Sequence, residues 1–383
     1  MVATTIKGLE DVLEKELKNL GAMDVSKGVR NVSFVGDKGF MYKANISLRT
    51  AIRILKPIKS FKVFDEEDLY EGLQKIRWEE YFDVDETFAI SSVVNSKFFT
   101  TNSHYIALKA KDAVADYFRH KYHKRPNVDL KHPNLRIHIH IQKDTCTVSL
   151  DSSGDSLHKR GYRSSTNIAP INEVLAAGLV LLSGFDGHTN FIDPMCGSGT
   201  ILIEAAMIAG DIPANINRPE FGFEKWKDYD EDLYFIIQDS LLKKIKNPQF
   251  KIMGFDKAPS AVQKAKENIK NANLDEFIGV HHVNFFNSTK EVFGNTTILF
   301  NPPYGERLSI DAEPFYKNIG DTLKHGYPGS KAWLITSDIE ALKFVGLRTS
   351  RRIDIKNGDL DCKFVMYDIY EGSKKAKKIN YQQ

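Results

Sequence analysis

Residues 191–200, which read FIDPMCGSGT, constrain the fold of this chain more than any other stretch. The first of them are typical of a buried strand, two glycines follow, and the mainly apolar residues 201–208 indicate a helix. Gly197 and Gly199 allow a tight turn and let a ligand approach the backbone closely, and a helix start offers unpaired N–H groups. Strand, glycine turn and helix in this order predict a doubly wound α/β domain that binds a nucleoside cofactor.

A purely structural turn would also explain two spaced glycines, so the neighbouring residues decide the interpretation. A dinucleotide fingerprint requires a third glycine where this chain has Leu202, and the Gly-Lys-Ser/Thr of a P-loop is absent. Asp193 stands at the strand end, where a carboxylate can bind the ammonium of an amino-acid-bearing cofactor. The motif Asp-Pro-x-Cys-Gly-Ser-Gly-Thr resembles the first motif of class I S-adenosylmethionine-dependent methyltransferases. The resemblance implies S-adenosyl-L-methionine as the cofactor, bound by Asp193, Met195, Gly197, Gly199 and Thr200.

Further cofactor contacts are expected at the ends of the next two strands. Asp256 follows an expected strand over 251–255 and can accept two hydrogen bonds from ribose hydroxyls, although it could instead cap the next helix. The resemblance also places Lys257 and Phe285 at the cofactor. In the family an Asp usually reaches the adenine amine, and the matching position here is Asn284. Its amide carbonyl could accept the same hydrogen bond, so this contact stays open.

Residues 296–305, TTILFNPPYG, read as a second buried strand that ends in a catalytic tetrapeptide. Methyl transfer to an exocyclic amine is difficult because the nitrogen lone pair is delocalised into the ring. The side-chain carbonyl of Asn301 and the main-chain carbonyl of Pro302 can hold such an amine, and Pro303 helps to rigidify the loop. Tyr304 offers a ring on which a flipped base can stack. This chemistry requires no metal. A structural turn is the alternative interpretation, and the glycine motif about a hundred residues upstream disfavours it.

Asn-Pro-Pro-Tyr resembles motif IV of amino-methyltransferases acting on adenine N6, guanine N2 or a protein glutamine. With the following Gly-Glu-Arg-Leu, residues 305–308, the resemblance over about residues 5–370 narrows to the large-subunit ribosomal RNA guanine-N2 methyltransferases of the L type. It implies methylation of guanine N2 in 23S rRNA, with the same chemistry on tRNA as one alternative. A DNA adenine methyltransferase should carry a DNA-recognition domain instead of this N-terminal half. A catalytically inactive RNA-binding factor is an alternative of another class.

The N-terminal half resembles an RNA-binding module. A helix over 9–20 should end at Gly21, and a second helix over 40–55 should stop before Pro57. The opening Gly-Leu-Glu-x-x-Leu-x-x-Glu-Leu resembles the ferredoxin-like start of RNA-modifying enzymes with a THUMP domain. The segment 97–136 then carries nine Lys and Arg against three Asp, interleaved with aromatic residues, which suits nucleic acid, although a solvated helix face is equally compatible. Candidate RNA-binding residues here are Arg119, Lys121, Lys124 and Arg125.

Residues 157–163, LHKRGYR, resemble the junction between the two halves of THUMP-linked methyltransferases. Lys159, Arg160 and Arg163 are therefore candidate RNA-binding residues, with an ordinary basic linker as the alternative. Residues 1–165 hold 27 Lys and Arg against 22 Asp and Glu, whereas the remainder of the chain is net negative. This asymmetry indicates that the N-terminal half grips a polyanionic substrate.

These observations predict an α/β protein with a Rossmann-like class I methyltransferase domain and an N-terminal ferredoxin-like plus THUMP module. An antiparallel strand pair near 351–370 should end the sheet. The expected segments are a ferredoxin-like unit (1–55), a THUMP domain (56–156), a basic junction (157–168), the methyltransferase domain (169–372) and a disordered basic tail (373–383). An insertion over 211–250 could be a substrate lid or a packed surface segment.

Composition limits the setting of the protein. The three cysteines among 383 residues show no metal-ligand spacing, which argues against disulfides and a zinc site and favours a reducing cytoplasm. No signal peptide is evident, and the most apolar run, 174–182, is too short to span a bilayer. We therefore expect a soluble, cytoplasmic protein with an RNA partner and no metal or membrane partner. The oligomeric state stays open.

Overall fold

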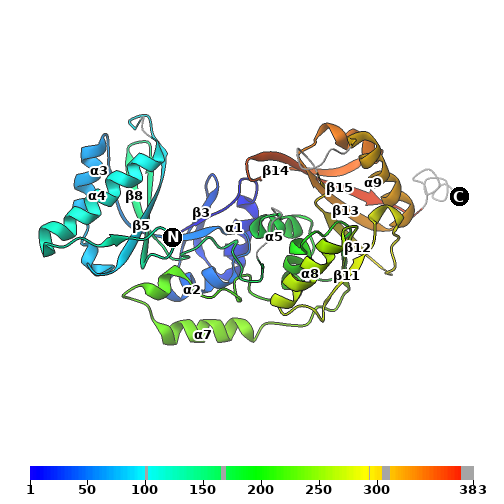
Figure 1. Ribbon diagram of the computed structural model, residues 1–383, viewed down its shortest axis with the longest axis horizontal. Coiled ribbons are helices and arrows are strands. Elements are labelled where there is room, and N and C mark those ends of the chain that lie inside the picture. Colours follow the sequence, from blue (N-terminus) through cyan, green and yellow to red (C-terminus); the bar gives the residue numbers. More distant parts are fainter. Residues whose placement is uncertain (100–101, 165–169, 293, 304–310, 372–383) are drawn as a thin grey trace.

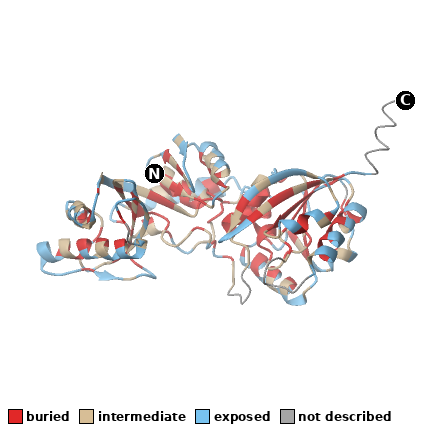
Figure 2. Ribbon diagram, turned by 90° about the horizontal axis from the view of Figure 1, so that it is seen from above, coloured by how far each residue is buried: buried red, intermediate tan, exposed pale blue. Residues whose placement is uncertain are grey.

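The computed structural model describes residues 1–99, 102–164, 170–292, 294–303 and 311–371. The molecule is elongated, with an N-terminal module (residues 1–156) at one end and a C-terminal domain (residues 170–371) at the other (Figure 1). Both parts are mixed α/β, which confirms the predicted fold class. Figure 2 shows the buried residues concentrated along the sheets and the inward faces of the helices. No described helix is long and apolar enough to cross a membrane.

The N-terminal module is built on one sheet of eight strands in the order β2-β3-β1-β4-β8-β7-β5-β6. Its elements are β1 (Val2–Thr4), α1 (Glu10–Leu20), β2 (Met23–Lys27), β3 (Asn31–Val35), α2 (Lys38–Ser47), β4 (Arg53–Lys62), α3 (Glu66–Gln74), η1 (Trp78–Glu80), β5 (Thr87–Asn95), α4 (Ser103–Tyr122), β6 (Asn127–Val128), β7 (Leu135–Gln142) and β8 (Thr145–Asp151). β4 pairs with β1 on one side and with β8 on the other. The expected boundary between residues 55 and 56 therefore falls inside a strand that both units share.

The second helix of the module is shorter than its sequence predicts. The prediction of a helix over 40–55 is wrong, because α2 ends at Ser47 and β4 begins at Arg53. The Glu16 carboxylate, from α1, accepts hydrogen bonds from the backbone N–H of Arg49 at 2.9 Å and of Thr50 at 3.0 Å. Those N–H groups would otherwise continue the helical ladder, so a side chain from far along the chain ends the helix.

The C-terminal domain holds a seven-stranded sheet in the order β11-β10-β9-β12-β13-β15-β14. Its elements are α5 (Glu173–Leu182), β9 (Asn190–Asp193), α6 (Thr200–Ala209), η2 (Gly222–Lys225), α7 (Glu231–Leu242), β10 (Ile252–Asp256), α8 (Pro259–Asn271), β11 (Ile278–His282), η3 (Phe285–Asn287), β12 (Thr296–Phe300), α9 (Ala312–Gly326), β13 (Ser330–Thr336), η5 (Glu340–Val345), β14 (Thr349–Asn357) and β15 (Leu360–Ile369). The strands from β11 to β13 are parallel, and β15 and β14 are antiparallel as predicted. The arrangement is a Rossmann-like sheet with a terminal hairpin.

The insertion over residues 211–250 packs against the N-terminal module. Phe221, Phe223 and Trp226 are buried in the same apolar core as the residues of that module. The ring of Phe223 stacks on Tyr42 of α2, with 4.4 Å between the ring centroids, and α7 runs alongside α2 (Figure 1). This packing favours the packed-segment interpretation over a substrate lid, since the insertion fastens the two parts of the chain together.

Candidate active site

Three polar side chains meet at the carboxyl edge of the C-terminal sheet. β9 lies between β10 and β12 and is parallel to both. Asp193 ends β9, Asp256 ends β10, and Asn301 directly follows β12. The strand order changes direction between β9 and β12, and ligands of open α/β sheets bind at this kind of switch point. Residues more than forty positions apart in the sequence therefore share one site.

The glycine turn between β9 and α6 needs both of its glycines. Gly197 has a φ of +52° and Gly199 a φ of +80°, values that side chains with a Cβ rarely adopt. A Cβ on Gly199 would lie 3.2 Å from the Cβ of Ala265 in α8. Gly197 donates its backbone N–H to Asp256 Oδ2 at 2.9 Å. The turn is thus held against the neighbouring strand and helix, with its shape set before a ligand binds.

Asp193 is a buried carboxylate in need of a positive partner. Its side chain is only 1% exposed, and Oδ1 accepts the backbone N–H of Met195 at 3.1 Å. Burial raises the pKa of Asp193 well above its ordinary value, and the nearby Asp256 adds to this. Among the ion pairs of the described residues, none involves Asp193. A ligand ammonium placed here would stabilise the charged form, so the residue fits the amino-acid end of S-adenosyl-L-methionine.

Asp256 holds the backbone at two points of the site, and ribose binding by its carboxylate stays a prediction. Oδ1 accepts the backbone N–H of Ala258 at the start of α8, at 2.9 Å, while Oδ2 holds Gly197. Each carboxylate oxygen has a second lone pair, so the group can still accept from ribose hydroxyls. Lys257 is exposed beside it, and its carbonyl lies 3.0 Å from Nε2 of His282.

Asn284 and Phe285 follow β11 at the same edge of the sheet. Contacts within the protein limit what their side chains can bind. The Asn284 side-chain carbonyl accepts the N–H of Phe286 at 3.1 Å and caps η3. The Phe285 ring is buried against Phe300 and Tyr327. The side chain of Phe285 therefore belongs to the core, and only its main chain is left to contact a cofactor.

Asn301 presents an unpaired acceptor at the centre of this edge. Its Oδ1 is buried and has no hydrogen-bond partner within the described part of the chain. Buried polar atoms in proteins nearly always have partners, so such an atom calls for a ligand donor. Pro302 is buried and Pro303 half-buried directly after it. The predicted stacking residue Tyr304, the Gly-Glu-Arg-Leu stretch and the expected tail 373–383 lie outside the described residues.

The structure contradicts the prediction that Arg160 contacts RNA. The Arg160 side chain is fully buried, with Nε 3.4 Å from the Glu204 carboxylate. Nη1 donates to Leu157 O and to Asn215 Oδ1, both at 2.9 Å, and Nη2 donates to Arg49 O. The guanidinium joins the junction, the insertion and the N-terminal module, so it is not available to a substrate.

Arg163 also acts inside the protein, where it supports the cofactor turn. Nη2 donates to Thr200 Oγ1 at 3.0 Å, and Nη1 lies 3.2 Å from the Glu173 carboxylate. The hydroxyl of Thr200 is thus bonded to the junction, and cofactor binding by Thr200 stays a prediction. Sequence reasoning missed Glu204 and Asn268; each is a polar residue on a buried helix face, and this is the signal that could have identified it.

Asn268 connects the junction to the glycine turn. Its Oδ1 accepts the backbone N–H of Ser164 at 3.1 Å, and its Nδ2 donates to Ser198 O at 2.9 Å. Together with Arg163 and Thr200, this gives the junction two hydrogen-bonded links to the turn. The junction therefore positions the cofactor turn as well as joining the two parts.

The four basic residues predicted on α4 and after it are exposed. Arg119 pairs with Asp116, Lys121 with Glu79 and Lys124 with Asp85. Of these pairs, only the Lys124–Asp85 pair is exposed on both sides, and exposed ion pairs are weak, so an RNA phosphate could replace this carboxylate. RNA binding by Arg119, Lys121, Lys124 and Arg125 stays a prediction.

The fold and the strand-end site define a Rossmann-like methyltransferase with an added N-terminal module. The family model described as RMKL-like, methyltransferase domain matches residues 160–366. A THUMP domain matches residues 63–151, and an RlmL ferredoxin-like domain matches residues 1–55. The chain belongs to the RMKL-like methyltransferase family.

Several relatives share this organisation over nearly their whole length. A Synechocystis protein, provisionally named an RNA methyltransferase, is 35% identical over 371 residues, which is 96% of each chain. The crystal structure of a provisionally assigned methyltransferase in complex with SAH is 30% identical, with a TM-score of 0.85 over 97% of this chain and 98% of the other. A provisionally assigned methylase from Clostridium difficile 630 is 31% identical, with a TM-score of 0.86 over the same shares.

Proposed function

We propose that this protein uses S-adenosyl-L-methionine to methylate the exocyclic N2 amine of a guanine in large-subunit (23S) ribosomal RNA. Family membership and a relative that binds SAH support the methyltransferase activity and its cofactor. The THUMP domain and the Synechocystis relative's name support RNA as the substrate. The observation that carries the chemistry is the buried, unpaired Oδ1 of Asn301 beside the two strand-end carboxylates.

Each polar residue at this edge of the sheet has its own proposed role. Asp193 would hold the ammonium of the cofactor's methionine part, and Asp256 the ribose hydroxyls. When bound, S-adenosyl-L-methionine supplies an electrophilic methyl group. Asn301 Oδ1 and the Pro302 carbonyl would accept hydrogen bonds from the target amine, which turns its lone pair out of the ring plane toward that methyl group. These acceptors are fixed before the reaction starts, and preorganised groups of this kind lower reaction barriers most effectively.

The target base also requires an aromatic side chain on which it can stack. Tyr304 would supply this support, since base–aromatic stacking contributes about 1–3 kcal/mol. We expect Tyr304→Phe to keep most activity and Tyr304→Ala to lose it, because the ring face does the holding. A Tyr304→Phe enzyme as inactive as Tyr304→Ala would assign the role to the hydroxyl instead.

The target is tested by nucleoside mass spectrometry of separated rRNA and tRNA from a deletion strain. We expect N2-methylguanosine to fall in large-subunit rRNA and to return with the wild-type gene, but not with an Asn301→Ala gene. Loss confined to tRNA would select the tRNA alternative. An unchanged nucleoside profile in both pools would refute the proposal. Calorimetry with S-adenosyl-L-methionine separates an enzyme from an inactive RNA-binding factor, which would show no binding.

A further inference from the structure

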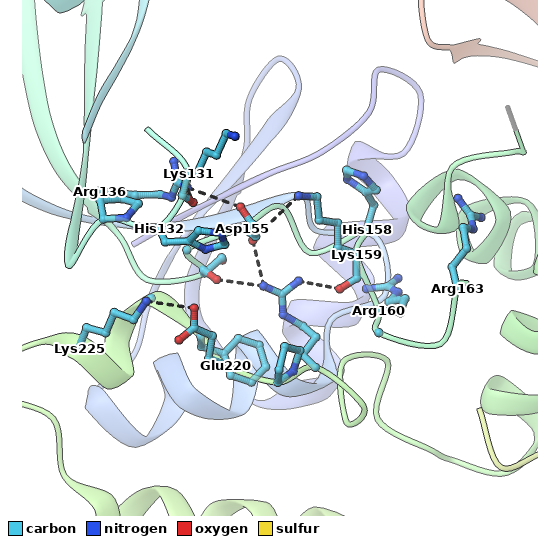
Figure 3. A pocket seen from close by; sticks show the side chains of 18 of the residues that line it. Lys131, His132, Arg136, Asp155, His158, Lys159, Arg160, Arg163, Glu220 and Lys225 are labelled. Carbon is cyan, nitrogen blue, oxygen red and sulfur yellow. Dashed lines mark hydrogen bonds and ion pairs between the residues drawn. The ribbon is translucent and has the colours of Figure 1, made fainter. Parts of the chain in front are cut away.

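A pocket of about 500 Å³ lies away from the strand-end site, where the N-terminal module, the junction and the insertion meet (Figure 3). Its walls come from the segment before and at the start of β7, from residues 153–164, from Glu173 of α5 and from residues 218–225. Seven Lys and Arg side chains line it, against three Asp and Glu. The pocket therefore has an excess of positive charge and the size of a small-ligand site.

Arg218 supplies a fixed positive charge in the wall of this pocket. Nη1 donates to the carbonyls of Ser156 and Lys159 at 3.0 and 2.8 Å, and Nη2 donates to those of Ser153 and Asp155 at 3.2 and 3.1 Å. Carbonyl groups orient a guanidinium without cancelling its charge, and no ion pair is formed by Arg218 among the described residues. Its Nε is buried without a hydrogen-bond partner.

Two exposed lysines line the pocket, and one of them could exchange its carboxylate partner for a phosphate. Lys131 and Lys159 are exposed, and Lys159 lies 2.9 Å from Asp155. Asp155 is also 3.6 Å from Arg136, so one carboxylate is shared by two cations (Figure 3). Exposed pairs of this kind contribute about 1 kcal/mol or less. A phosphate could therefore replace the carboxylate at little cost, and Lys is a common phosphate ligand.

The titration of His158 is consistent with this excess of positive charge. Its pKa is lowered to about 4, first by burial and then by the neighbouring cations Lys159, Arg163, Arg160 and Arg218. The imidazole is therefore neutral at neutral pH, and it could become a donor to an anion that offsets those cations.

We propose that this pocket binds a phosphate group of the RNA substrate, with Arg218 as the fixed cation and the exposed Lys131 and Lys159 as additional ones. The inference rests on the proposed RNA substrate. The location supports a polymer, since the pocket opens to the surface between the THUMP domain and the methyltransferase domain. An RNA strand held here would be anchored beside the junction that also supports the cofactor turn.

The test compares two double variants that remove the same charge. Lys131→Ala/Lys159→Ala alters the pocket, and Lys243→Ala/Lys244→Ala is the control. Lys243 is matched to Lys159, because both are exposed and paired with an Asp four residues earlier, Asp239 and Asp155. RNA affinity is measured at several salt concentrations. Two lost phosphate contacts should lower the slope of log affinity against log salt by about 1.4 for single-stranded RNA and the affinity by roughly tenfold. The control should bind as wild type does.

Further measurements on the same proteins distinguish the remaining outcomes of this test. An unchanged slope in the pocket variant, or an equal loss in the control, would overturn the proposal. Inorganic phosphate that binds wild type but not the pocket variant, while RNA affinity is equal in both, would assign the pocket to a free anion and also overturn it. SAH affinity should be the same in all three proteins, which shows that the cofactor site is intact. A wild-type protein that shows the pocket-dependent slope but methylates no RNA would refute the proposed function and leave the pocket assignment standing.

Discussion

Replacing Asn301 by alanine should separate activity from stability. The proposed chemistry makes Asn301 Oδ1 one of two fixed acceptors for the target amine. Loss of one preorganised polar group typically lowers the rate by about 10²–10³, or roughly 2.7–4 kcal/mol of barrier. We therefore expect the single-turnover rate of Asn301→Ala to fall at least about a hundredfold at saturating cofactor and RNA, with cofactor affinity little changed.

The same substitution should leave the fold as stable as before. Oδ1 is buried and has no partner among the residues that the structure describes, and an unsatisfied buried acceptor costs about 1–3 kcal/mol. Removing it relieves that cost, while the loss of side-chain contacts acts in the opposite direction. The free energy of unfolding, measured in urea, should therefore stay level or rise by up to about 2 kcal/mol.

Asn215 provides the matched control. It is also buried, but its Oδ1 accepts from Arg160 at 2.9 Å and its Nδ2 donates to Asn45 O at 2.7 Å. Asn215→Ala removes the partner of one Arg160 N–H and of the Asn45 carbonyl. The substitution should therefore lower the free energy of unfolding by about 2–3 kcal/mol. An Asn301→Ala enzyme that works at nearly the wild-type rate would refute the amine-holding role. One that loses stability as Asn215→Ala does would show that Asn301 is a structural residue.

Three further substitutions test the surroundings of the site. Asp193→Ala should weaken S-adenosyl-L-methionine binding by at least about tenfold, because a charged hydrogen bond is lost; unchanged affinity in calorimetry would remove that role. Arg160→Ala should lower the free energy of unfolding by about 3–5 kcal/mol, since it leaves the buried Glu204 carboxylate with the Tyr162 hydroxyl as a donor but without its ion-pair partner; wild-type stability in urea would contradict this. The pKa of His158 is about 4 in the folded protein against about 6.5 unfolded, so its contribution to stability is present above pH 6.5 and lost as the pH falls through 4. His158→Gln should therefore lose less thermal stability than wild type between pH 6.5 and 4.5. An equal loss in both proteins would disprove the lowered pKa of His158.

The junction shows how basic residues in one short motif divide their tasks. Arg160 is buried against Glu204, Arg163 bonds to Thr200, and Lys159 is exposed at the phosphate pocket. Two of the three cations therefore hold the protein together, and the third is exposed at the pocket. The links from Ser164 through Asn268 to Ser198 give this segment direct contact with the cofactor turn. The junction therefore connects the N-terminal module to the cofactor turn through hydrogen bonds.

The sequence by itself determined those features that depend on short-range backbone rules. Gly21 ends α1 in the left-handed conformation, as a glycine after a helix predicts. The glycine turn after β9 and the position of Asn301 after β12 follow from strand, turn and helix patterns within ten residues. Parallel strands place their carboxyl ends at one edge, so these motifs were also sufficient to bring Asp193, Asp256 and Asn301 together.

Only the tertiary structure decided which partners the remaining polar groups take. Glu16 ends α2 from another helix, Asn284 caps η3, and Arg160 is enclosed by three segments of the chain. A charged residue looks the same in the sequence whether it lies on the surface or inside an interface. Its environment is set by contacts with residues far along the chain, and these contacts exist only once the two sheets and the insertion have packed together.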